Sequence, residues 1–202
     1  MSDRTDVATV RRGEFVQLRP LAECDAERTL AWRHSERAAL LNRGAETIAA
    51  QAEWIRSRPG SERNFVIELV DGGPVGMLSL IGIDQVNAHA ESARFLIGEP
   101  DAVKGVPAAV EAMKLLYELA FDELGLERVW GLVIEENKRM LKWQLYLGMR
   151  QEGRLRNHYF IGGRFQDAIC LGILAEEYRG VALPRMNALI ATARRQREMP
   201  PR

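Results

Sequence analysis

Residues 95–107 read FLIGEPDAVKGVP, which joins an apolar strand end, a short polar loop and the start of a helix. The first amides of a helix have no acceptor within the helix and point outward, so this order predicts an anion-binding pocket. Further along the chain, residues 128–137 (RVWGLVIEEN) form a second strand that runs into a second helix. Two neighbouring junctions of this kind suit a ligand with a phosphate at one end and a reactive group at the other.

The helix that follows the loop has the clearest pattern in the chain. Its apolar residues recur three and four positions apart and form one face: Val106, Val110, Met113, Tyr117, Ala120, Phe121 and Leu124. Pro107 falls in the first turn, where its missing N–H breaks no helical hydrogen bond. Gly125 is a suitable end, so the pattern predicts a helix over 106–124.

The other segments alternate between strand and helix patterns. Residues 15–19 form a strand that Pro20 ends, and three later strands with tight turns between them predict an antiparallel meander. The remaining expected elements are helices over 22–34 and 47–58 (capped by Thr47), strands over 64–70, 74–83, 93–98 and 128–134, a helix from Asn137 to Gly148, a hairpin of 149–156 and 164–174, and a helix over 183–197. This order predicts an α/β or α+β fold with one sheet covered on both faces.

The composition is that of a single globular domain. The 202 residues are 47% hydrophobic and 28% charged, which is enough for one good-sized core. Lysine plus arginine and aspartate plus glutamate are equal at 28 each, so charge gives no reason to expect nucleic acid or an acidic membrane as a partner. The helix over 183–197 is locally basic, which suits a solvated helix, a dimer arm or a contact for an acidic partner.

Cys24 and Cys170 are the only cysteines, and two distant cysteines make neither a disulfide framework nor a zinc site. We therefore expect buried thiols and no metal. No apolar run approaches the length of a membrane span, and the N-terminal residues have no apolar signal core. These features predict a cytoplasmic protein.

Several short motifs stand in order along the chain: LRPL at 18–21, AWRHSE at 31–36, QAEWI at 51–55, GMLSLIGID at 76–84, AF at 120–121, ENKRM at 136–140, LGM at 147–149 and EGRLRNHYFIGGRFQDA at 152–168. Together with the element order they resemble the GNAT superfamily of acyl-CoA N-acyltransferases. Within it the chain is similar to the branch of ribosomal-protein N-terminal acetyltransferases and the amino-sugar acetyltransferase of the pseudaminic-acid pathway. The resemblance implies a mixed, mostly antiparallel sheet of about seven strands, helices on both faces, and splayed fourth and fifth strands.

The resemblance also implies a division of the chain. We expect a flexible lead at 1–13, a GNAT acyltransferase domain at 14–178, and a basic C-terminal helix and tail at 179–202. The implied co-substrate is acetyl-CoA.

In the family, amides of the loop after the fourth strand hold the pyrophosphate of CoA. The matching residues here are Ala102, Val103, Lys104, Gly105, Val106 and Pro107. Gly105 keeps the family's glycine, whereas Ala102 replaces a polar or basic residue and Pro107 replaces a second small one. Because proline has no N–H, one phosphate donor is missing and CoA should bind more weakly. The charge of Lys104 compensates in part.

The thioester arm, by the same resemblance, enters the gap between the two splayed strands. It pairs there with the main chain of Phe95, Leu96 and Ile97, and a backbone amide near Leu96 is the expected oxyanion donor.

Asn137 has two compatible roles, since it caps the helix that follows and binds the pantetheine arm by resemblance. Met140 and Gln144 share its helix face and are expected cofactor contacts, with ordinary packing as the alternative. Gln144 stands where the family usually has a tyrosine that protonates the leaving thiolate. Tyr146, two positions later, faces another direction on a helix and is not assigned that role.

Three residues are candidates for the base that takes the proton of the amine: Glu91, His89 and His158. Glu91 is alternatively a solvated charge at a strand end, and the two histidines are alternatively turn residues. The resemblance places His158, Trp32 and Arg33 near the acceptor, with a surface position as the alternative for Arg33. No GxSxG motif occurs and neither cysteine has a neighbouring histidine, which agrees with direct transfer.

These observations predict an acetyl-CoA-dependent N-acetyltransferase that acts on the primary amine of a small molecule, such as an amino sugar. Two alternatives stay open: a protein N-terminal acetyltransferase, and a GNAT-fold module that binds CoA with little or no catalysis. Ala102, Pro107 and Gln144 are the residues that favour the second alternative. A homodimer is compatible with the sequence.

Overall fold

An eight-stranded sheet runs through the computed structural model, which describes residues 10–41 and 44–199. Its order is β1-β2-β3-β4-β5-β6-β8-β7, and all neighbouring strands are antiparallel except β5 and β6. The strands are β1 (Arg11–Arg12), β2 (Val16–Pro20), β3 (Arg63–Leu69), β4 (Pro74–Asp84), β5 (His89–Ile97), β6 (Arg128–Ile134), β7 (Arg150–Ile161) and β8 (Arg164–Leu174). The predicted mixed, mostly antiparallel sheet is confirmed.

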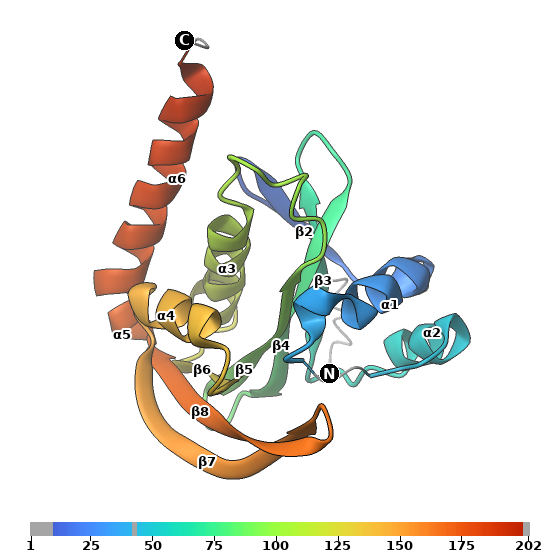
Figure 1. The fold of residues 1–202 in the computed structure, drawn as a ribbon. Coiled ribbons are helices and arrows are strands. Elements are labelled where there is room, and N and C mark those ends of the chain that lie inside the picture. The colour runs from blue at the N-terminus through green and yellow to red at the C-terminus, as the bar shows by residue number, and fades with distance from the viewer. Residues whose placement is uncertain (1–9, 42–43, 200–202) are drawn as a thin grey trace, which may run out of the picture.

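Helices cover both faces of this sheet (Figure 1). On one face α1 (Ala26–His34) packs against α2 (Ile48–Arg56), and on the other lie α3 (Ala108–Glu118), α4 (Lys138–Tyr146) and α6 (Leu183–Glu198). Successive side chains of a strand point to opposite faces of the sheet, so one strand contributes to the cores on both faces. Phe65 and Ile67 of β3 enter the larger core with α3, whereas Val66 enters a smaller core with Trp32.

The helix boundaries differ from the predicted ones at two ends. The segment predicted as a helix from residue 22 begins with a 3-10 turn, η1 (Glu23–Asp25), in which Asp25 accepts from the Ala22 amide at 2.9 Å. In the segment predicted over 106–124, Pro107 is the N-cap and α3 begins only at Ala108. A π-helical turn, η3 (Leu119–Glu123), then completes it.

Segments near both ends of the described residues form part of the fold. Arg11 and Arg12 pair with β2, so the expected flexible lead is too long by this strand, and residues 1–9 lie outside the described residues. After β8 come α5 (Ala175–Glu177) and the π-helical turn η4 (Tyr178–Ala182). Met186 and Ile190 of α6 are buried in the larger core, so this helix belongs to the same packing unit.

The strands β5 and β6 pair over a short distance and then separate. Parallel partners are found only from His89 and Arg128 to Glu91 and Trp130. Beside this point, β5 carries a bulge against β4: the register passes from Ser79–Ala93 to Met77–Leu96. Arg94 within the bulge has φ 56°, a left-handed conformation that is uncommon outside glycine. The predicted splay is therefore present, and it begins immediately after Glu91.

Two predicted helix caps are confirmed by their hydrogen bonds. The Thr47 side chain accepts from the Ala50 amide at 3.2 Å, and the Asn137 side chain accepts from the Met140 amide at 3.1 Å. The C-terminal hairpin is longer than predicted because β7 continues to Ile161. No helix within residues 10–41 and 44–199 is both long and apolar enough to cross a membrane.

Candidate active site

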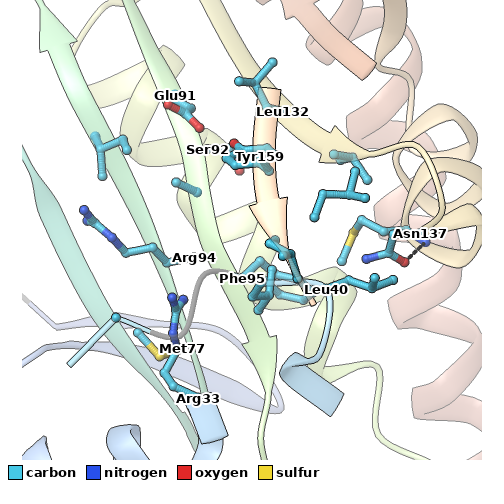
Figure 2. A pocket seen from close by; sticks show the side chains of 18 of the residues that line it. Arg33, Leu40, Met77, Glu91, Ser92, Arg94, Phe95, Leu132, Asn137 and Tyr159 are labelled. Carbon is cyan, nitrogen blue, oxygen red and sulfur yellow. Dashed lines mark hydrogen bonds between the residues drawn. The ribbon is translucent and has the colours of Figure 1, made fainter. Parts of the chain in front are cut away.

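A cavity of about 450 Å³ opens where β5 and β6 separate. Its walls come from both faces of the fold: β5, β6 and α4 on one side, and α1, α2 and the end of β7 on the other (Figure 2). The residues used below that line it are Arg33, Trp54, Glu91, Arg94, Phe95, Asn137, Met140, Gln144 and Tyr159. The cavity thus joins the gap between β5 and β6 to a polar chamber beside α1, which is lined by Arg33, Glu91, Arg94 and Tyr159.

The end of the cavity beside α4 is mostly apolar. Phe95 stacks on Trp143 with ring centroids 5.2 Å apart, which fixes the wall between β5 and α4. Met140 lies one helical turn after the Asn137 cap. Figure 2 shows Asn137 at this end, across Phe95 from Arg94. A slender chain with few charges fits between these walls.

Gln144 adds an unsatisfied polar group to the same wall. Its side chain is 6% exposed, and its Oε1 atom has no hydrogen-bond partner among the described residues. A buried amide oxygen without a partner carries a desolvation cost that a ligand N–H can remove. Because Gln144 also lines the cavity, this oxygen is a candidate acceptor for an amide group of a ligand that packs against α4.

Glu91 and Tyr159 stand in the polar chamber. Burial raises the pKa of the Glu91 carboxyl, and the positive charge of Arg94 opposes that rise. Burial also raises the pKa of the Tyr159 hydroxyl, and the Glu91 charge adds to the effect. The two groups are thus electrostatically coupled inside the cavity. A carboxylate with a raised pKa is a better proton acceptor than an exposed one.

Two arginines complete the chamber, and their surroundings differ. Arg94 donates to Glu62 at 2.8 Å and to the Asn64 side-chain oxygen at 2.8 Å, and its guanidinium lies 4.9 Å from the centre of the Trp54 ring. Arg33 has no ion-pair partner within residues 10–41 and 44–199. Burial lowers the pKa of Arg33, and Arg94 lowers it further.

The loop predicted to hold a phosphate lies outside this cavity. Gly105 has φ 74°, which explains the need for glycine there. The Val106 amide donates to the Val103 carbonyl at 3.1 Å, so it is engaged within the loop. The first helical hydrogen bond of α3 runs from Glu111 to Pro107, which leaves the amides of 108–110 without acceptors in the helix. These are the donors best placed for an anion.

The family follows from the sequence comparison. A family model described as "Acetyltransferase (GNAT) domain" matches residues 16–150. The chain belongs to this GNAT family. The match contains the bulged β5, the gap beside it and all of α4, whereas the cavity residue Tyr159 on β7 lies outside it.

Individual relatives share part of their length with the chain. The spermidine N(1)-acetyltransferase of Escherichia coli (strain K12) is 33% identical over 118 residues, which are 58% of this chain and 61% of the relative. The putative ribosomal N-acetyltransferase YdaF of Bacillus subtilis (strain 168) is 32% identical over 112 residues, 55% of this chain and 60% of the relative. The matches therefore span about three fifths of these curated relatives.

Solved structures agree over more of the chain. The crystal structure of a putative acetyltransferase is 29% identical, with a TM-score of 0.72, and the alignment covers 89% of this chain and 92% of that one. A spermidine N-acetyltransferase from Vibrio cholerae in complex with CoA and spermine has a TM-score of 0.72 at 23% identity, covering 83% of this chain and 100% of that one. The second likeness concerns the fold alone.

The predicted GNAT site residues divide between the main cavity, a second hollow and positions that line neither. Glu91, Phe95, Asn137, Met140, Gln144 and Arg33 line the main cavity together. Lys104, Gly105 and Val106 border a separate hollow beside the end of α6, and Ala102, Val103 and Pro107 line neither. Within the described residues no group of three or more His, Cys, Asp or Glu side chains is placed to hold a metal ion.

Four further predicted contacts do not line the cavity: Trp32, Leu96, Ile97 and His158. Trp32 is 4% exposed in the smaller core, where its indole N–H donates to Glu99 at 2.8 Å. Leu96 is buried in the same core, and the main chain of Leu96 and Ile97 pairs in register with β4. His158 is exposed on β7, with its ring edge against Tyr159.

His89, the third candidate base, also lies outside the cavity. Its Nε2 is 4.0 Å from the Asp84 carboxylate, and its buried Nδ1 has no partner among the described residues. This histidine sits at the start of β5, two residues before Glu91.

Sequence reasoning missed Tyr159 and Arg94, and both sit at irregular backbone. The β7–β8 register slips between Leu155 and Tyr159, and Asn157 there has φ 51°. This bulge decides whether residue 158 or 159 faces the cavity. Arg94 reads as an ordinary strand residue until the bulge of β5 is seen. No signal in the sequence distinguishes these bulged residues from their neighbours.

Proposed function

We propose that the protein transfers the acetyl group of acetyl-CoA directly to the primary amine of a small molecule. One observation supports this above all: a single cavity joins the gap between β5 and β6 to a chamber that holds the desolvated carboxyl of Glu91. A slender acyl carrier and an amine can therefore meet beside Phe95. Relatives whose names give spermidine as the acceptor support a small amine.

The acyl carrier would be held mainly by β5 and α4. Gln144 offers its unpartnered oxygen to an amide N–H of the pantetheine arm, and Asn137 and Met140 form the wall beside it. The phosphates would lie at the N-terminus of α3, where the amides of 108–110 have no acceptor within the helix. Lys104 beside this end is exposed and pairs with Asp101 at 2.8 Å, an exposed partner that a phosphate would replace. Acetyl-CoA supplies an activated acetyl group as a thioester.

The residues of the chamber handle the amine. Glu91 accepts a proton from the ammonium, directly or through water, which leaves the nitrogen free to attack the thioester carbonyl. A main-chain amide stabilises the oxyanion that forms. As this intermediate collapses, the C–S bond breaks and the CoA thiolate leaves, taking up the second proton of the nitrogen to give the free thiol and the acetylated amine. The sequence predicts this donor near Leu96. We place it at the bulge of Arg94 and Phe95 instead, because the residues of β5 that line the cavity end at Phe95.

The function is tested with purified protein, acetyl-CoA and a panel of acceptors, following release of the free thiol of CoA. The panel contains spermidine, amino sugars, amino acids and short peptides with free N-termini. Acetylation of small amines is the expected result. Acetylation of peptides alone would replace the small-molecule proposal with a protein acetyltransferase. Calorimetric binding of CoA without transfer to any acceptor would leave a binding module.

A further inference from the structure

We propose that the acceptor amine also carries an oxyanion, a carboxylate or a phosphate, and that Arg33 binds it. This inference rests on the proposed function and names the acceptor's chemical class. The charged residues that line the cavity are Arg33, Glu91 and Arg94. These three charges differ in whether a neighbouring group carries the opposite charge.

Arg94 is already neutralised from outside the cavity. Its guanidinium donates twice to the Glu62 carboxylate, at 2.8 and 3.3 Å, and Glu62 itself does not line the cavity. Arg94 therefore has little net charge to offer a ligand. It still faces Arg33 closely enough to lower the pKa of that guanidinium.

Arg33 is a cavity-lining charge that has no ion-pair partner among the described residues. Across residues 10–41 and 44–199 it forms no ion pair, although burial costs its charged form enough to lower its pKa. Arginine remains charged under these conditions, so the cost is not relieved by losing the proton. An anionic ligand group relieves it, and the planar guanidinium matches the geometry of carboxylates and phosphates.

The position of Arg33 is fixed by its neighbour. Trp32 is locked in the smaller core and donates to Glu99, so the last turn of α1 is anchored and the next side chain is directed into the chamber. The guanidinium reaches toward Gly44, where an added Cβ would lie 3.9 Å from Arg33 Nη2. In the view of Figure 2, Arg94 lies between Arg33 and Glu91. An amine at Glu91 and an anion at Arg33 therefore require separate groups on one acceptor.

The same arrangement disfavours an acceptor whose charged groups are all ammonium ions. Such a molecule would place a second cation near the unmatched guanidinium, and like charges in a partly desolvated chamber repel strongly. A zwitterionic amine meets both charges with groups of opposite sign.

The test uses acceptor pairs that differ only in the anionic group. Propylamine and β-alanine form the carboxylate pair, glucosamine and glucosamine 6-phosphate form the phosphate pair, and spermidine is the polycationic acceptor. We expect kcat/KM to be about 10- to 100-fold higher for the anionic member of at least one pair. Which pair shows the preference tells a carboxylate from a phosphate.

Variants then assign the preference to Arg33. Arg33→Gln should abolish it through KM for the acceptor, with KM for acetyl-CoA unchanged, and Arg33→Lys should keep part of it. Arg28→Gln is the matched control, because Arg28 is an exposed arginine on the same helix. Thermal unfolding of each variant checks that the fold is intact.

Failure of this inference can be told from failure of the proposed function. If amines are acetylated but the members of both pairs react equally, or spermidine is preferred, the inference is wrong and the acetyltransferase remains. An anion preference that survives in Arg33→Gln also overturns it. If CoA binds and no amine is acetylated, spermidine included, the proposed function fails and the inference fails with it.

Discussion

Arg94 on β5 and Glu62, the residue before β3, form an ion pair of 2.8 Å behind the wall of the cavity. Arg94 also donates to Asn64, which accepts from Ser79 of β4 at 2.7 Å, so the bulge of β5 is tied to two other strands. The left-handed φ of Arg94 costs free energy, and these contacts offset that cost. The bulge that shapes the reaction chamber is therefore held from behind, by residues that no ligand needs to touch.

Glu62→Gln should weaken this support and destabilise the protein. The Glu62 and Arg94 side chains are 11% and 19% exposed, so the loss is expected at about 1–3 kcal/mol, measured by urea unfolding. Glu53→Gln is the control, because Glu53 pairs with Arg56 on the surface and is 64% exposed. An equal effect of the two variants would contradict the role given to Glu62.

The same pair predicts how stability depends on pH. Burial acts to raise the pKa of Glu62, but the hydrogen bonds from Arg94 and Asn64 outweigh it and hold the pKa below 4.5. A carboxyl whose pKa is lowered by folding stabilises the native state above its unfolded pKa. That contribution is lost as pH falls through the folded pKa. The difference in unfolding free energy between wild type and Glu62→Gln should therefore be full near pH 7 and shrink below pH 4.5.

Glu91→Gln should reduce kcat by about 100-fold or more, because the amine loses its proton acceptor. Burial raises the pKa of Glu91 above 4.5, so wild-type kcat/KM should fall with decreasing pH through a limb that lies above this value. That limb should vanish in the variant. Glu176→Gln, at an exposed position on α5, is the control. An unchanged pH profile in Glu91→Gln would assign the base elsewhere.

The stability of Glu91→Gln tests separately whether the Glu91 carboxyl is buried and whether the variant still folds. Because burial disfavours its charged form, the ionised carboxyl destabilises the folded state above its raised pKa, and a neutral glutamine removes that cost. The midpoint of thermal unfolding of Glu91→Gln near pH 8 should equal or exceed that of wild type. A lower midpoint together with lost activity would indicate damage to the fold instead of a lost base.

Features that depend on neighbouring residues could be predicted from the sequence. Features that depend on contacts between distant residues could not. The caps at Thr47 and Asn137 depend on residues within one turn, so the sequence reveals them directly. Trp32 was expected at the acceptor, but its burial depends on Glu99 and on the sheet face that α1 covers, which are distant in sequence. The choice between His158 and Tyr159 depends on a bulge, which shifts side chains by one position and leaves no clear mark on composition.

Gly105→Val should weaken CoA binding at least 10-fold by calorimetry, since the side chain stands where the phosphates approach the loop. An added Cβ meets nothing within 4 Å in the protein itself, so the effect arises from the ligand and from φ 74°. Gly162→Val separates these two causes. Gly162 has φ 63° and equal space around it, but lies on the turn between β7 and β8. Equal losses in both variants would mean that backbone strain, and not phosphate approach, is responsible.

Pro107→Gly tests the missing phosphate donor at the same loop. It restores an N–H at the N-cap of α3, so CoA binding should tighten or stay the same. A marked loss of affinity would show that the fixed φ of the proline shapes the loop and that its lack of an N–H is unimportant.

Gln144→Leu should separate ligand binding from stability. The buried Oε1 atom has no partner among the described residues, so an apolar side chain of similar size should leave the unfolding free energy unchanged or raise it by about 1 kcal/mol. The same change removes the acceptor proposed for the pantetheine arm, and Kd for CoA should rise about 10-fold. Gln151→Leu on the exposed face of β7 is the control for adding an apolar side chain. Unchanged CoA affinity in Gln144→Leu would show that the arm runs along a different wall of the cavity.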